Sequence, residues 1–172
     1  MKNKIKSLSK KVLVIVGIIL ICILIWNLLH PSNIDLVKRY DIQDIISVSV
    51  SKNITDITNS DNSKLVNIDI TPEQQEMVLS CIFQPRYHLD GKFTGEQFQN
   101  NTLNVIIVFV YYTNSSGVKV SWEYYISDVG NIRAWTLFLD DTSQDLKSTL
   151  YTIDSGPDWQ TIYNKLDAIF PQ

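Results

Sequence analysis

The feature that most constrains this chain is an uncharged apolar run near its amino terminus, residues 12–29. A helix of these 18 residues, rising ~1.5 Å per residue, is roughly 27 Å long, which is close to the thickness of the hydrocarbon core of a bilayer. A cleaved secretory signal has a shorter apolar run, usually ~7–15 residues, and ends in small residues. This run ends instead in Trp26, Asn27, Leu28 and Leu29. The sequence therefore predicts one uncleaved transmembrane helix.

The charges around the run predict its orientation. Residues 1–11 contain five lysines and no acidic residue, whereas bases and acids are mixed after the run. By the positive-inside rule, the lysine-rich tail lies in the cytoplasm and the rest of the chain lies outside the cell membrane. We expect Lys10 and Lys11 at the inner interface, and Trp26 at the outer interface, to anchor the helix.

The charge of the remaining chain narrows the possible partners. Residues 33–172 contain 10 Lys and Arg against 18 Asp and Glu, a net charge of −8. Such a domain is repelled by phosphate backbones and by anionic lipid headgroups, so nucleic acid is not expected as a partner. The glycines are scattered and form no phosphate-binding loop, so no nucleotide is expected either. The 11-residue tail is too short to fold as a cytoplasmic domain.

Outside the membrane, the pattern predicts a tether followed by one domain. Residues 30–45 have weak apolar spacing, and we assign them to the tether. Residues 46–172 form the predicted extracytoplasmic domain, which begins with Ile46, Val48 and Val50 alternating with serines, the period of a half-buried strand. Strands are predicted over residues 46–51, 66–70, 103–112, 118–126, 132–139 and 149–153. The segment 83–101 is polar and irregular.

Two helices accompany these strands. In the first, Thr71 precedes Pro72, and Gln74 follows at the third position, which is the pattern of a capping box. The second begins after Asp158, and its apolar residues recur at helical spacing. This stripe consists of Trp159, Ile162, Tyr163, Leu166 and Phe170. The predicted fold class is α+β: an N-terminal transmembrane helix, then one mainly antiparallel sheet of five or six strands with two packed helices.

Chemistry-bearing residues are few. Cys81 and His88 could form a nucleophile and base, with Asp90 beside them, but Cys81 lies on the apolar stripe of its helix, where an unpaired cysteine is usually a core residue. Zinc needs three or four nitrogen or sulfur ligands, and the outer domain has one histidine. The acidic loop at residues 140–145 lacks the spacing and the glycine of a calcium-binding EF-hand. We expect no catalytic, cofactor or metal site.

The sheet has more apolar residues than two helices can cover. Residues 103–112 are apolar on both faces, and Tyr125 lies off the alternating core set of its strand. On the next strand either Trp135, Leu137 and Leu139 or Ile132 and Phe138 must point away from the helices. We predict a second face that includes Tyr125, Trp135 and Leu137. The segment 83–101 covers it, or it binds a partner.

The layout of a lysine-rich start, one helix and a small β-α-β-β-β-β-α domain resembles uncharacterised single-pass, membrane-anchored extracytoplasmic proteins of Gram-positive bacteria. The resemblance covers the whole chain and implies a cell-envelope location, with no residue role. Our leading hypothesis is a non-enzymatic, membrane-anchored module that binds a protein or another envelope component. The alternatives are a self-protection (immunity-type) protein against an extracellular toxin or peptide, and an enzyme that acts on envelope material.

Overall fold

The computed structural model describes residues 2–29, 31–55, 63–92, 104–138 and 149–171 of the 172-residue chain. The chain divides into two compact units, Met1–Pro31 and Ser32–Gln172. The first contains one helix, α1 (Lys2–Leu29), whose side chains are described for residues 12–28. The large apolar side chains of that stretch are exposed.

The helix predicted over residues 12–29 is therefore present in the backbone. A search of the described residues finds no helix whose length and hydropathy would let it cross a membrane. The transmembrane role of residues 12–29 stays a prediction.

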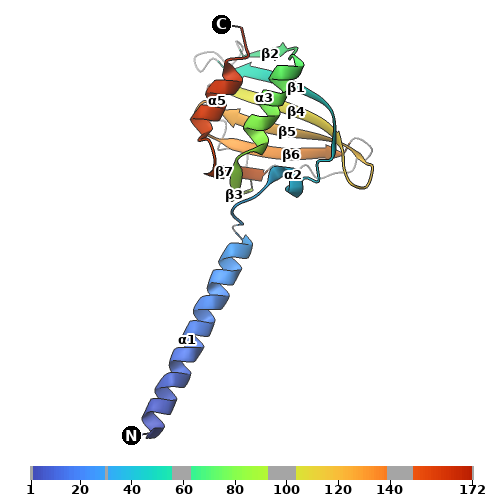
Figure 1. Cartoon of the computed structure of the whole chain (residues 1–172). Helices are drawn as coiled ribbons and strands as arrows, with labels where there is room; N and C mark the ends of the chain where they lie inside the picture. Colours follow the sequence, from blue (N-terminus) through green and yellow to red (C-terminus); the bar gives the residue numbers. More distant parts are fainter. Residues whose placement is uncertain (1, 30, 56–62, 93–103, 139–148, 172) are drawn as a thin grey trace. The chain divides into compact units, whose positions relative to one another are not determined.

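The second unit contains a single seven-stranded sheet in which every pair of neighbouring strands is antiparallel (Figure 1). Its strand order is β2-β1-β4-β5-β6-β7-β3. The strands are β1 (Asp44–Ile54), β2 (Lys64–Ile68), β3 (Arg86–Lys92), β4 (Asn104–Thr113), β5 (Lys119–Ser127), β6 (Ile132–Phe138) and β7 (Thr149–Ser155).

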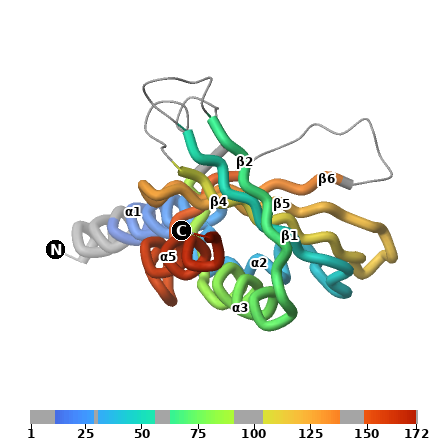
Figure 2. The backbone as a smooth tube through the Cα atoms, turned by 90° about the horizontal axis from the view of Figure 1, so that it is seen from above, coloured from blue at the N-terminus to red at the C-terminus, as the bar shows by residue number. Residues whose placement is uncertain are grey.

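Three helices of this unit gather on one face of the sheet, as Figures 1 and 2 show: α2 (Leu36–Arg39), α3 (Pro72–Phe83) and α5 (Trp159–Asp167). The capping box predicted at Thr71 is present, because its side chain accepts from the Gln74 amide while the Gln74 side chain accepts from the Thr71 amide. Asp158 caps α5 by accepting from the Thr161 amide. The α+β class, with one antiparallel sheet and packed helices, is confirmed.

One strand was not predicted. β3 lies within the segment that the sequence indicated to be irregular, and it forms an edge of the sheet by pairing with β7. Its register shifts between Leu89 and Gly91, and its alternation is interrupted by charged residues. An edge strand with a bulge has little periodic signal of its own, since its partner is more than 50 residues away in the chain.

The segment assigned to the tether differs most from expectation. The folded unit begins at Ser32, and Ile34, Leu36 and Ile42 are buried in its core. Leu36 is fully buried, at 0% exposure. We call residues 32–43 the strap. Its three core residues lie in different local structures: Ile34 in an isolated bridge, Leu36 in the short helix α2, and Ile42 after the turn at Asp41. No single period runs through them, so the sequence pattern did not reveal their burial.

The strap is bound to the edge strand β3. Ile34 donates its amide to the carbonyl of Tyr87 at 2.7 Å and accepts from the Tyr87 amide at 3.0 Å. Asp35 caps α2 and forms an ion pair with Arg86. These contacts cover backbone groups that an edge strand otherwise exposes.

Toward the opposite edge, β1, which lies between β2 and β4, departs from strict alternation. The register with β4 shifts between Ile45 and Ser47, a β-bulge that places Ile46 outside the regular pairing. Ile46 is 57% exposed, whereas Ile45 packs against the core. The predicted inward position of Ile46 is wrong, because one extra residue reverses which side chains face the helices.

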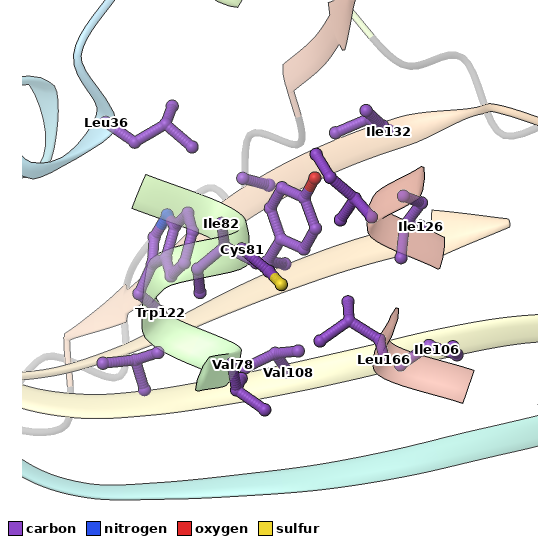
Figure 3. Packing of buried hydrophobic residues seen from close by; sticks show 14 of the residues in the cluster. Leu36, Val78, Cys81, Ile82, Ile106, Val108, Trp122, Ile126, Ile132 and Leu166 are labelled. Atoms are coloured by element: carbon purple, nitrogen blue, oxygen red, sulfur yellow. The ribbon is translucent and has the colours of Figure 1, made fainter. Parts of the chain in front are cut away.

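The core lies between the helices and the sheet (Figure 3). Val78, Cys81 and Ile82 of α3 and Leu166 of α5 meet residues of the central strands, including Trp122 of β5. Tyrosines fill much of the remainder and satisfy their hydroxyls internally. Tyr112 donates to the Tyr40 carbonyl at 2.6 Å, Tyr87 donates to the Ile82 carbonyl at 2.8 Å, and the Tyr40 and Tyr151 hydroxyls bond each other at 2.7 Å.

Candidate functional site

The face of the sheet opposite the helices is built from residues that alternate with the core positions. Residues paired directly across antiparallel strands share a face, so the register defines this surface row by row. From β1 to β6 the rows are Ser47, Tyr111, Ser121 and Leu137; Ser49, Phe109, Glu123 and Trp135; and Ser51, Ile107, Tyr125 and Arg133. Aromatic and apolar side chains thus occupy the middle of the face, and β1 adds a line of serines.

An arginine and two rings form the centre of this surface. The Arg133 guanidinium carbon lies 4.0 Å from the centroid of the Tyr125 ring and 5.0 Å from that of Trp135. The two rings meet edge to face, with centroids 5.1 Å apart. The Tyr125 hydroxyl donates to the Glu123 carboxylate. Cation–π contacts and a charge-assisted hydrogen bond fix the geometry of all four side chains.

The electrostatic setting of this cluster follows from its partial burial. Burial raises the pKa of Tyr125, and the hydrogen bond to Glu123 and the charge of its carboxylate raise it further. Burial lowers the pKa of Arg133, while Tyr125 and Glu123 oppose that shift. Both residues keep their usual protonation at neutral pH: a neutral phenol that donates and a charged guanidinium.

Exposure is uneven over the surface. Tyr125 is 7% exposed, Trp135 is half-buried, and Leu137 is 36% exposed. The half-buried side chains of Phe109 and Tyr111 lie beside them in the register. We call Phe109, Tyr111, Tyr125, Arg133, Trp135 and Leu137 the aromatic face.

The structure brings the predicted residues Tyr125, Trp135 and Leu137 onto one face, and Ile132 belongs to the core instead. Of the segment 83–101 that was considered as a cover, residues 86–92 form β3, and residues 93–101 lie outside the described part. Arg133 was missed. Its position two residues before Trp135 was a usable signal, since alternate residues of a strand share a face.

The considered Cys81–His88 pair is not assembled. Cys81 is 7% exposed on the helix side of the sheet, where its thiol contacts the Met77 sulfur at 3.7 Å. Burial raises the pKa of this thiol, which opposes nucleophilic use. His88 follows the buried Tyr87 on β3, so its side chain belongs to the other face.

The other predicted positions are only partly described. Among the residues with described positions, no group of three or more His, Cys, Asp or Glu residues could hold a metal ion. The acidic loop at residues 140–145 lies outside that part of the chain, as do the side chains of Lys10 and Lys11. Trp26 is exposed on α1.

Comparison of the chain with protein-family models, with curated proteins and with solved structures finds no match. The function must therefore be argued from the geometry of the chain itself.

Proposed function

We propose that this protein is a membrane-anchored, extracytoplasmic interaction module without enzymatic activity, which binds a protein or another component of the cell envelope. Its aromatic face is the binding surface. The α1 helix is the anchor, with residues 1–11 in the cytoplasm and the folded unit outside.

The observation that carries the binding role is the composition and exposure of the aromatic face. Phe109, Tyr111, Arg133 and Trp135 are half-buried and Leu137 is exposed, around the nearly buried ring of Tyr125 and beside the exposed Ser47 and Ser49 of β1. Aromatic and arginine side chains are the residue types enriched in the energetic centres of interfaces. Because neighbouring side chains hold Tyr125, Arg133 and Trp135 in place, a partner would order few of them on binding, which lowers the entropic cost of association.

The anchor is supported by the sequence. Residues 12–29 carry no charge and have the length of a bilayer core, and the preceding lysines favour a cytoplasmic amino terminus. An anchored module searches for its partner within the membrane plane, so a weak face can give substantial occupancy through a raised effective concentration.

Site-specific crosslinking in intact cells tests the proposal. A photoreactive residue in place of Leu137 is expected to crosslink to one discrete partner. The same residue in place of Leu65 is the matched control, because Leu65 is also an exposed leucine, 57% exposed, but belongs to the edge strand β2. Equal products from both positions, or none from Leu137, would contradict the binding role.

Two substitutions separate binding from stability. Leu137→Ser removes an exposed apolar side chain, and we expect capture to fall while the free energy of unfolding changes within about 0.5 kcal/mol. Tyr125→Ser removes a nearly buried ring, so it should lower both capture and stability. Unchanged capture in Leu137→Ser would place the interface elsewhere.

A further inference from the structure

The sheet opens where β6 stops following β7. Pairing between these strands ends at Ile132 and Tyr151, but β7 continues to Ser155 with β3 on its other side. The residues that precede Ile132 form the β5–β6 turn, in which the Gly130 amide donates to the Ser127 carbonyl. Among the described residues, no strand pairs with the β6 side of residues 152–155. Alternate residues there direct N–H and C=O groups into the opening.

Two hollows flank this opening. They have volumes of about 280 Å³ and about 300 Å³, and both are lined by Gly130, Ile132 and Thr152. Pockets for drug-sized ligands are roughly 300–1,000 Å³. The space therefore suits a single side chain better than a large cofactor.

The charged groups lining these hollows have one sign. Asp154 and Asp158 line the first hollow together with Trp159, and Asp90 lines the second. No lysine or arginine is among the described residues that line either one. The indole of Trp159 adds a ring that can contact a cation.

Two of these carboxylates, those of Asp154 and Asp158, are held by neutral donors. Asp154 accepts the Asn33 amide through Oδ2 at 2.7 Å, and none of the described residues bonds to its Oδ1. The amide and hydroxyl of Thr161 lower the pKa of Asp158, so this group stays ionised at neutral pH. Neutral donors orient these oxygens without supplying a positive charge.

Two arginines of these strands, among the residues with described side chains, are engaged elsewhere. Arg133, which faces Leu150 in the register, has its guanidinium over the Tyr125 ring, on the β5 side of β6. Arg86, opposite Ser155, is paired with Asp35 of the strap.

We propose that the β6–β7 opening binds a basic side chain, a lysine ammonium or an arginine guanidinium, carried by an extended segment of a protein partner. The acidic lining and the net charge of −8 over residues 33–172 attract such a group and repel anionic ones. The open edge of β7 can meanwhile bond the backbone of the segment, as in strand addition. This site does not include residues of the aromatic face. An experiment can therefore contradict one proposed binding site without contradicting the other.

Titration of the full chain in an uncharged detergent tests the site. The probes are two capped tripeptides, Ala-Lys-Ala and Ala-norleucine-Ala, which differ in one ammonium group. Two-dimensional NMR follows the backbone amides of Gly130 and Thr152 and the indole N–H of Trp159. We expect saturable shifts of all three with the lysine peptide, and at least about tenfold weaker binding of the norleucine peptide.

Two asparagine substitutions in the site and one control substitution elsewhere complete the test. Asp90→Asn and Asp154→Asn, alone and together, should each weaken the lysine peptide severalfold and leave the amide spectrum otherwise native. Asp69→Asn removes the same charge beside β2 and should leave the affinity unchanged. Equal binding of both peptides, shifts away from the opening, or an equal loss in Asp69→Asn would overturn the proposal. The crosslinks from position 137 do not depend on these results.

Discussion

Two glycines in the folded unit show how much one side-chain atom matters. Gly117 and Gly130 both adopt positive φ, 78° and 86°, a region that L-residues disfavour. A Cβ on Gly117 would meet no atom within 4 Å, whereas a Cβ on Gly130 would lie 2.8 Å from the Trp159 ring. Glycine is therefore needed at position 130 for two reasons: the backbone has a positive φ, and the Trp159 ring of α5 leaves no room for a Cβ.

We predict unequal costs for the two alanine substitutions. Gly117→Ala should destabilise the folded unit by about 1–2 kcal/mol through backbone strain alone. Gly130→Ala should cost about 1–3 kcal/mol more, because the indole must move. Urea denaturation of both variants measures the difference. Equal costs would mean that Trp159 shifts freely and does not fix the β5–β6 turn.

At the scale of elements, the strap is part of the folded unit, whereas the sequence had indicated a tether. Ile34, Leu36 and Ile42 are core residues, and backbone hydrogen bonds tie the strap to β3. Folded structure therefore begins at Ser32, three residues after the end of α1, which leaves no room for a long unfolded tether between them. The strap also covers the β3 edge, which reduces unwanted strand addition there.

The strap yields a prediction about stability. Leu36→Ala should destabilise the unit by about 2–5 kcal/mol, the usual cost of truncating a buried leucine. Ile46→Ala is the control, since Ile46 is exposed at the bulge and should cost little. A chain of residues 32–172 should unfold cooperatively, whereas residues 46–172 should not. Cooperative unfolding of the shorter chain would show that the strap is dispensable.

At the scale of the whole molecule, the two cysteines report the proposed topology. Cys22 lies on α1, and Cys81 is buried in the folded unit. An impermeant maleimide added to intact cells under mild denaturant should modify Cys81 and not Cys22, since only the outer domain is accessible. The raised pKa of the Cys81 thiol makes this reaction slow until the core opens.

Mass spectrometry of the labelled cysteine peptides measures this outcome, with Cys81→Ser as the control that should remain unlabelled. Labelling of Cys81 only after the cells are permeabilised would contradict the outward orientation. The result bears on the anchor and on the location of the aromatic face together, because both belong to one chain.

What the sequence determined by itself was local. The capping box at Thr71, the cap at Asp158 and the alternation of β4, β5 and β6 rest on residues a few positions apart, so their patterns were sufficient to predict two helices and a meander. The apolar alternation also predicted a second face with Tyr125, and with Trp135 and Leu137 as one of two alternatives on the next strand; the register places these three on one face.

Only the tertiary structure decided features that depend on distant partners. The edge strand β3 exists because β7 pairs with it, and the strap is buried because β3 and the helices receive it. The bulge at Ile46 and the position of Arg133 over two rings likewise follow from strand register. The β6–β7 opening follows from where two strands stop pairing. Strand register depends on contacts between strands throughout the sheet. A short stretch of sequence includes only one side of those contacts, so it cannot predict the register.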